Sequence, residues 1–226
     1  MVWIRYALYF FLVVAVLGVL TRLEVNYPGF LNIQVFLNPT DSLGTSEYSP
    51  IELMQPVMLL ACCALMLWVA LYCPAQRTIA VGLGGLSLAF MVRELDFFFN
   101  RLIVENLWQV IIGIAGALVI VYLYRHNKRL RIAVARTWPS PGFVLLFAGG
   151  CVLAGAVHLV GHEPLWQSIA GDAYQRAIKL AVEEFVELLG YLFWLIGTIE
   201  YAYEAKALAF NPRVPARRRR EGRRRK

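Results

Sequence analysis

The sequence predicts an all-α protein, a polytopic membrane bundle of six transmembrane helices with both termini in the cytoplasm. Composition is the first observation behind this fold class. Hydrophobic residues make up 59% of the 226-residue chain and charged residues only 16%, whereas soluble globular chains average about 45–50% and about 25%. The second observation is length, because a bilayer core about 30 Å thick requires roughly 20 apolar residues per helix. Together they exclude a soluble fold, a disordered chain and a secreted disulfide scaffold.

Six apolar stretches have the required length, and each is apolar on all sides, whereas the strands of a membrane barrel alternate apolar and polar residues. In chain order, we expect spans at 3–20, 53–73, 78–99, 108–124, 143–160 and 180–203. The first span has a single charged residue, Arg5, and no Ala-x-Ala cleavage site follows it, so we interpret it as an uncleaved signal anchor. Four cysteines lie in or at the ends of spans and are expected to pack there.

Glycines and a helix cap predict how the third, fifth and sixth spans pack and where the last helix begins. Glycines in the third and fifth spans should allow neighbouring helices to approach closely; they are Gly82, Gly84, Gly85, Gly149, Gly150 and Gly155. Asp172 and Gln175 form a capping box, which predicts that the last helix starts outside the membrane and continues to Ala207. That helix covers about 36 residues, or roughly 54 Å at 1.5 Å per residue. Residues 164–169 should form one or two interfacial turns anchored by Trp166.

The loops predict the orientation. With both termini inside, 17 of the 22 Lys and Arg residues lie on the cytoplasmic side, which is the bias that the positive-inside rule describes. All acidic residues except Glu200, Glu204 and Glu221 then lie in outer loops or at outer helix ends. We therefore predict a multi-pass protein of the cytoplasmic (inner) membrane.

The domain prediction follows from the same pattern. Residues 1–208 form the six-helix transmembrane domain, in which the outer loop 21–50 is an ordered cap, and residues 209–226 form a disordered basic cytoplasmic tail. From Arg213 onward the tail carries nine Lys and Arg and one acid, so it accounts for the net charge of +7. Such a cluster beside a span attracts anionic lipid, and its position argues against nucleic acid as the partner. The lipid bilayer is the expected partner, together with another membrane protein or a second copy of the chain.

Ionisable side chains within spans are costly and require an explanation. Here they gather near the outer ends of four spans: Glu52; Arg93, Glu94 and Asp96; His158 and His162; and Glu183, Glu184 and Glu187. Because these ends share one depth, we expect the groups to converge in the outer third of the bundle.

The spacing within this cluster points to a metal. His158 and His162 are four residues apart, as are Glu183 and Glu187, so each pair should share one helix face. Imidazole and carboxylate ligands suit zinc, iron or manganese. We therefore predict a divalent metal cofactor held by His158, His162 and one of Glu183 or Glu187. Glu94 and Asp96 are the candidate catalytic residues: either could act as a base on metal-bound water, orient an imidazole ligand, or be a further ligand.

The leading functional hypothesis is thus a metal-dependent membrane enzyme that acts on a lipid or another membrane-embedded substrate. Two alternatives use the same residues: a proton- or cation-coupled transporter or channel subunit, and a non-catalytic subunit whose polar groups orient its helices. Under the simplest interpretation, the histidines are hydrogen-bonded polar residues, and Arg93 and Asp96 form an ion pair within one helix. Glu200, in the last span, is expected to accept a hydrogen bond from a neighbouring helix; a proton path between it and Glu187 is the alternative.

Overall fold

The computed structural model describes residues 2–31, 49–96, 99, 106–138 and 140–210, and every regular element in these ranges is helical. The elements are α1 (Val2–Asn26), α3 (Pro50–Tyr72), α4 (Arg77–Glu94), α6 (Leu107–Arg125), α7 (Asn127–Thr137), α8 (Pro141–Cys151), the π-helix η1 (Val152–Ala156), α9 (Val157–Val160), α10 (Glu163–Ala170), the 3₁₀ turn η2 (Gly171–Ala173) and α11 (Arg176–Phe210). The predicted all-α class is therefore confirmed.

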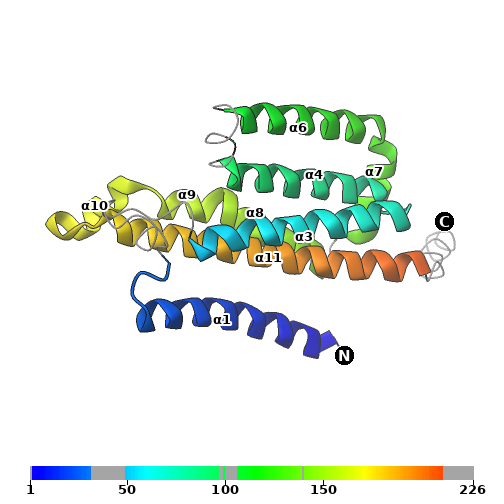
Figure 1. Ribbon diagram of the computed structural model, residues 1–226. Helices are drawn as coiled ribbons and strands as arrows, with labels where there is room; N and C mark the ends of the chain where they lie inside the picture. The colour runs from blue at the N-terminus through cyan, green and yellow to red at the C-terminus, as the bar shows by residue number, and fades with distance from the viewer. Residues whose placement is uncertain (1, 32–48, 97–98, 100–105, 139, 211–226) are drawn as a thin grey trace, which may run out of the picture.

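The long helices lie side by side along one common direction (Figure 1). The start of α1, the turn between α3 and α4, α7 and the end of α11 lie at one end of the bundle, which we call the terminal end. The start of α3, the end of α4 and α10 lie towards the opposite end, which we call the distal end.

The core forms around α11, which packs against α8 and α3, while α3 packs against α4. Its buried face includes Leu188, Tyr191 and Tyr201, all at most 1% exposed. Backbones of α8 and α11 approach closely, since a Cβ at Gly149 would lie 2.9 Å from the Gly190 carbonyl oxygen. The predicted role of Gly149 in helix packing is confirmed, and Gly190 contributes from the facing helix. By contrast, a Cβ at Gly155 would meet open space.

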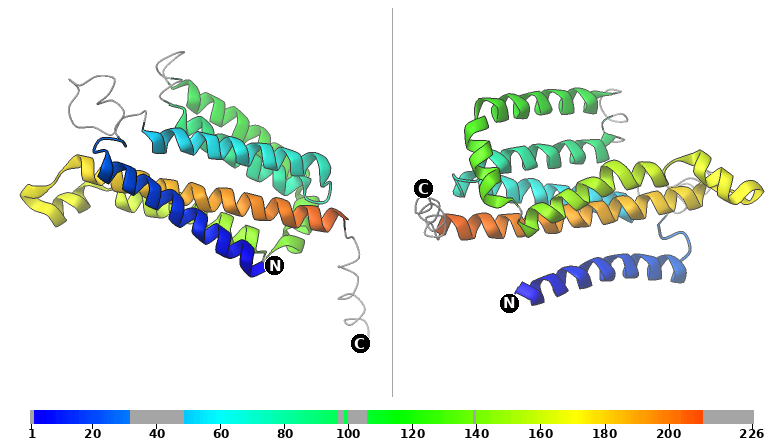
Figure 2. Two further views of the ribbon diagram at one scale, coloured as in Figure 1. Left: turned by 60° about the horizontal axis from the view of Figure 1, so that its bottom comes forward. Right: turned by 180° about the vertical axis from the view of Figure 1, so that it is seen from behind.

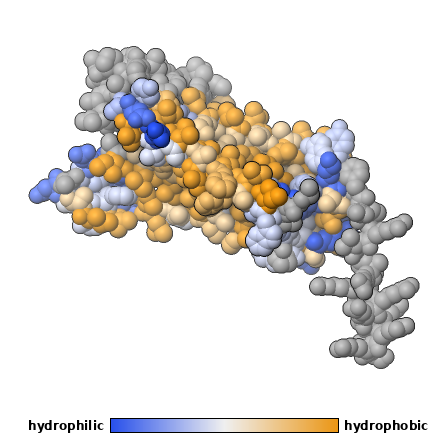
Figure 3. Space-filling model, turned by 90° about the horizontal axis from the view of Figure 1, so that it is seen from below, coloured by the Kyte–Doolittle hydropathy of each residue, from blue (hydrophilic) through white to orange (hydrophobic). Residues whose placement is uncertain are grey.

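Helices α6 and α1 lie at the periphery of the bundle, on opposite sides of the core (Figures 1 and 2). In the most apolar part of α6 none of the residues is buried, and in α1 only 6% are. Figure 3 shows hydrophobic side chains over the middle of the molecule and hydrophilic ones nearer its ends. A face of this kind is stable against lipid rather than water.

Within the described ranges, four helices are long and apolar enough to cross a membrane: α1, α3, α6 and the continuous helix Pro141–Val160. The chain is therefore a helical, membrane-embedded protein. The third and sixth predicted spans do not reach the same apolarity, because α4 carries three charged residues and α11 carries five glutamates.

Several boundaries differ from those predicted. The last helix is 35 residues long, as expected, but it begins at Arg176. The predicted capping box at Asp172 is wrong because residues 171–173 form a 3₁₀ turn, in which Gly171 has a φ of +52°. The predicted turns at 164–169 are confirmed as α10.

The predicted cap and tail are covered only in part. Helix α1 continues to Asn26, where the Glu24 carboxylate accepts hydrogen bonds from the backbone N–H groups of Gly29 and Leu31, at 3.0 and 2.8 Å. Residues 32–48 of the cap and 211–226 of the tail lie outside the described residues. At the start of the predicted tail, residues 209–210 belong to α11.

Two elements were not predicted. Helix α7 is amphipathic: Ala133 and Thr137 are buried, whereas Lys128, Arg131 and Arg136 are exposed. The π-helix η1 interrupts the fifth span between α8 and α9. Such π segments often occur at functional sites, and this one carries Leu153, which packs against Gly190 of α11.

Candidate functional site

Charged and polar side chains of α4 and α11 meet at the distal end. Nη2 of Arg93 donates a hydrogen bond to Oε1 of Glu187 at 2.5 Å, and its Nε lies 3.6 Å from Oε1 of Glu94. The hydroxyl of Tyr191 donates to the same Glu94 oxygen at 2.6 Å. We call these four residues the distal polar cluster. Charge-assisted bonds of this length are among the stronger hydrogen bonds in proteins.

Helix geometry explains how the cluster assembles. Glu187 and Tyr191 are four residues apart, so they project from one face of α11 towards α4. Arg93 and Glu94 end α4, where a cation is favoured by the partial negative charge of the helix C-terminus. The cluster thus joins the end of one helix to the flank of another.

A cavity of about 440 Å³ adjoins the cluster. Its polar wall consists of Glu52, Gln55, Arg93, Glu94, Asp96 and Glu187. Its apolar wall consists of Leu53, Pro56, Val57, Leu60, Met91 and Leu95. We call this cavity the distal pocket. Its volume lies in the range of pockets that hold small organic ligands, about 300–1,000 Å³.

One polar side chain of the pocket has unused hydrogen-bonding capacity. Gln55 is 1% exposed, and neither the oxygen nor the nitrogen of its side-chain amide has a hydrogen-bond partner among the described residues. A buried amide without partners is destabilising by roughly 1–3 kcal/mol. A group that satisfies Gln55 would come from outside the described part of the chain.

The structure brings together three of the six residues predicted as the site. Glu94, Asp96 and Glu187 line the distal pocket, together with Glu52, so the expected convergence of the second, third and sixth spans is confirmed. The ion pairs described for Arg93 go to Glu187 and Glu94, and its predicted pairing with Asp96 is not among them.

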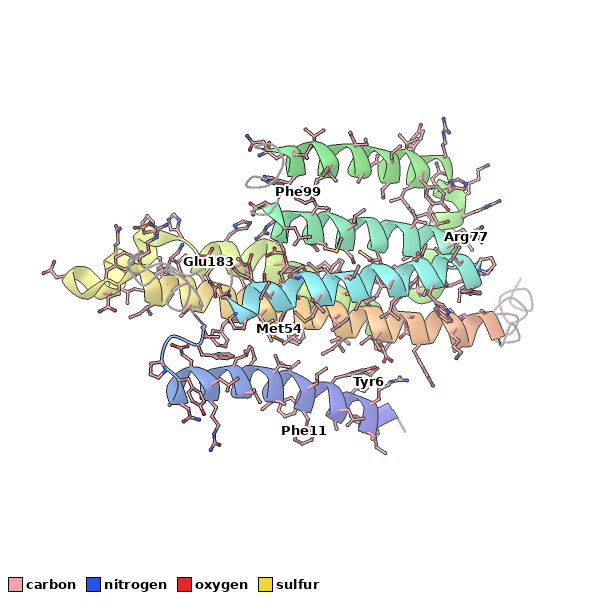
Figure 4. The ribbon with its side chains drawn as sticks, in the orientation of Figure 1. Tyr6, Phe11, Met54, Arg77, Phe99 and Glu183 are labelled. Carbon is pink, nitrogen blue, oxygen red and sulfur yellow. The ribbon has the colours of Figure 1, made fainter. Side chains whose placement is uncertain are left out.

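The other three predicted residues lie elsewhere. Helix α9 ends at Val160, so the inference that His158 and His162 share a helix face is wrong. Both histidines are exposed and are not among the residues that line the pocket. Glu183 forms an ion pair with Lys179 at 2.8 Å, and in Figure 4 it lies close to α9.

A metal centre stays a prediction. Among the described residues, no group of three or more His, Cys, Asp or Glu side chains is arranged to hold an ion. The four predicted ligands, His158, His162, Glu183 and Glu187, are thus not assembled into one site in this arrangement.

Gln55 and Tyr191 are the site residues that the sequence interpretation missed. Gln55 follows Glu52 by three residues in an otherwise apolar helix, and Tyr191 follows Glu187 by four. Both spacings indicate a shared helix face, so an inspection of all polar residues one turn from each carboxylate would have found them.

A second polar cluster lies at the terminal end. Oε1 of Glu200 accepts a hydrogen bond from Arg5 at 2.6 Å and Oε2 accepts one from the Tyr9 hydroxyl at 2.9 Å. Tyr6 lies on the side of α1 that faces α11, with its hydroxyl 3.4 Å from Glu200, whereas Phe11 lies on the outer side (Figure 4). We call Arg5, Tyr6, Tyr9 and Glu200 the terminal polar cluster. The prediction that Glu200 accepts a hydrogen bond from a neighbouring helix is confirmed.

Buried hydrogen bonds also join α11 to α4 and to the turn that precedes α4. The Trp194 indole donates to the Ser87 hydroxyl at 2.9 Å, and the Tyr201 hydroxyl donates to Gln76 at 3.1 Å. An indole N–H donates but does not accept a hydrogen bond, so Trp194 is unsuited to pass a proton along this row. These bonds are typical of helix packing, in which polar side chains join neighbouring spans.

Comparisons with known proteins give no match. A scan against protein families, a search of curated proteins and a search of solved structures each find nothing similar to this chain. The geometry and chemistry of the distal pocket are therefore the features that indicate a function.

Proposed function

We propose that this protein is a multi-pass protein of the cytoplasmic membrane that binds an amphiphilic, membrane-embedded substrate in its distal pocket. In this proposal the chain crosses the membrane six times, both termini are cytoplasmic, and the distal pocket lies near the outer surface. The alternative uses of the same carboxylates, for proton- or cation-coupled transport or for subunit assembly, predict no retained amphiphile.

Charge distribution supports this topology. Arg5, Arg77 and the exposed basic residues of α7 all belong to elements at the terminal end (Figures 1 and 4). Glu52, Asp96 and Glu187 belong to the distal end, around the pocket. Basic residues favour the cytoplasmic side of a membrane, so this separation favours a cytoplasmic terminal end. Six crossings follow if α4 and α11, which lie alongside the four apolar helices, also span the bilayer.

One observation carries the functional proposal: a single pocket combines a charged wall with an apolar wall. On the apolar wall, the side chains of Leu53, Val57 and Leu60 are 45%, 66% and 59% exposed. They lie on α3, one of the four helices that are apolar enough to cross the membrane. A molecule in the pocket would therefore place a polar head against the distal polar cluster and an apolar chain against lipid.

The sequence predicts that the protein carries out metal-dependent chemistry on such a substrate, and the proposal keeps Glu94 and Asp96 as its catalytic residues. In the structure both residues line the pocket, which supports contact with substrate. Elemental analysis of the purified protein tests the metal. About one equivalent of zinc, iron or manganese that is lost in His158→Ala would support the metal-dependent form, and metal-free protein would contradict it.

Substrate binding is tested by native mass spectrometry of protein extracted in a mild non-ionic detergent. We expect the wild type to retain an amphiphile and Val57→Trp to lose it, because the larger side chain fills the pocket. Val110→Trp is the matched control, since Val110 is a similarly exposed valine on α6, 56% exposed against 66% for Val57. A wild type without a bound amphiphile, or equal retention by Val57→Trp, would contradict the proposal.

A further inference from the structure

We infer that the distal pocket selects an amphiphile whose head carries an ammonium group; this inference rests on the proposed function and names its substrate class. It depends on three features of the pocket: the charge of its polar wall, the engagement of its arginine, and the unpartnered amide of Gln55.

The charge of the polar wall favours a cation. The described part of the lining carries four acidic side chains, Glu52, Glu94, Asp96 and Glu187, and one guanidinium, that of Arg93. Glu52 has a partner of its own, and the other three acidic side chains still outnumber Arg93 by two. Coulomb attraction between such a wall and an ammonium group is strong beside lipid, where the effective dielectric constant is low. A phosphate or carboxylate head would be repelled.

Arg93, the cation in the described part of the pocket lining, is already engaged. Its guanidinium is bonded to Glu187 at 2.5 Å and lies 3.6 Å from Glu94, whose carboxylate is held in turn by Tyr191. An anionic head would have to compete with these carboxylates inside the same pocket. An ammonium head leaves the ion pairs in place and adds a further cation to the acidic wall.

Gln55 supplies the neutral part of the recognition. Its amide oxygen accepts a hydrogen bond from an N–H group, and its amide nitrogen donates to an oxygen. Both atoms are buried and lack partners among the described residues. A head with an ammonium group beside a hydroxyl or ether oxygen would satisfy both atoms at once. A bare metal ion would satisfy only the amide oxygen.

Because the pocket has an apolar wall, the ligand that fits it is an amphiphile rather than a free amine. Val57 and Leu60 lie one and two turns further along α3 from Leu53, so the wall extends from the polar end of the pocket towards the middle of the span. An alkyl chain along this wall contacts apolar side chains on one side and lipid on the other, so it stays out of water. The geometry therefore suits a long-chain amine or amino alcohol.

Photo-crosslinking of the full chain in phosphatidylcholine nanodiscs tests the inference. Three probes share one C16 chain with a diazirine and differ only in the head: primary amine, hydroxyl or phosphate. Crosslinked peptides are identified by mass spectrometry. We expect the amine probe to label residues 53–60 and 91–96 most strongly. Dodecylamine should displace it and ethanolamine should not, because ethanolamine lacks the chain.

Two variants and one control complete the experiment. Gln55→Leu and Asp96→Asn should each reduce labelling by the amine probe by about tenfold, the change that corresponds to about 1.4 kcal/mol. Asp96 is half-buried, so Asp96→Asn should fold even if Gln55→Leu does not. Glu183→Gln removes a carboxylate from α11 one turn from Glu187 but outside the pocket lining, and its labelling should equal that of the wild type.

Each contrary outcome is distinguishable. Equal or stronger labelling by the phosphate or hydroxyl probe would overturn the ammonium assignment but leave the amphiphile pocket in place. Displacement by ethanolamine as effective as that by dodecylamine would overturn the role of the chain. Unchanged labelling in both pocket variants would overturn the recognition by Gln55 and Asp96. If no probe labels the pocket above the level of α6, the proposed function fails as well.

Discussion

The distal and terminal polar clusters contain the same residue types but differ in their surroundings. Each pairs an arginine with a glutamate of α11, Arg93 with Glu187 and Arg5 with Glu200, and each includes tyrosine. The distal cluster adjoins a cavity of about 440 Å³. In the terminal cluster Glu200 is 1% exposed and both of its oxygens are bonded to α1. Packing around an ion pair, not its composition, thus determines whether the pair only joins helices or also borders a cavity.

The difference follows from the position of the helices. Helix α1 has few buried residues, and the terminal cluster provides its strongest polar contacts with α11. Arg5 also lies over the ring of Tyr203, 4.3 Å from its centroid. Without a large apolar interface, these directional contacts have to hold α1 in place. The distal cluster instead joins α4 and α11, and α4 also packs against α3 and α6.

We expect the largest loss of stability when Glu200 is replaced. Glu200→Ala leaves Arg5 and Tyr9 without their acceptor, and breaking a buried ion pair costs about 3–5 kcal/mol. Because Arg5 is 27% exposed, we expect a value near the lower limit. Thermal unfolding in detergent measures it, with Lys206→Ala, an exposed residue of the same helix, as the control. Equal melting temperatures for Glu200→Ala and Lys206→Ala would show that the terminal cluster does not hold α1.

We expect Tyr9→Phe to reduce stability by less than Glu200→Ala does. This substitution removes only the hydrogen bond to Oε2 of Glu200, at 2.9 Å, and leaves the Arg5 ion pair intact. Hydrogen bonds to charged groups contribute about 1.5–3 kcal/mol, so the variant should lie between the wild type and Glu200→Ala. A stability equal to that of Tyr27→Phe, an exposed tyrosine beyond the end of α1, would contradict this ranking.

Glu187→Gln should change stability least of the three, although it breaks the corresponding ion pair of the distal cluster. Arg93 is 43% exposed, and exposed pairs contribute about 0–1 kcal/mol. We expect the same unfolding temperature as the wild type within a few degrees, together with weaker crosslinking by the amine probe. A destabilisation as large as that of Glu200→Ala would remove the distinction between the two clusters.

Cysteine labelling at exposed positions tests which side of the membrane each cluster faces. Cysteines introduced at Gln167 in α10 and Arg131 in α7 occupy exposed positions near the distal and terminal ends. We expect a membrane-impermeant maleimide to label Gln167→Cys in intact cells and Arg131→Cys only after lysis, relative to the wild-type background. The reverse pattern would place the distal pocket in the cytoplasm.

The sequence by itself determined the helices and their environment. Apolar runs of membrane-spanning length predicted six long helical segments, and each is found, because hydropathy and length are local properties of the chain. The clustering of charges at span ends also predicted that Glu52, Glu94 and Glu187 would converge. That prediction needed only the antiparallel order of successive spans.

Tertiary structure decided the rest. Gln55 became a site residue only because α3, α4 and α11 bury it beside an acidic cavity. In a helix that is apolar on all sides, periodicity does not show which face meets a neighbour. Contacts between helices therefore determine which polar side chains are satisfied, and which, like Gln55, still require a partner.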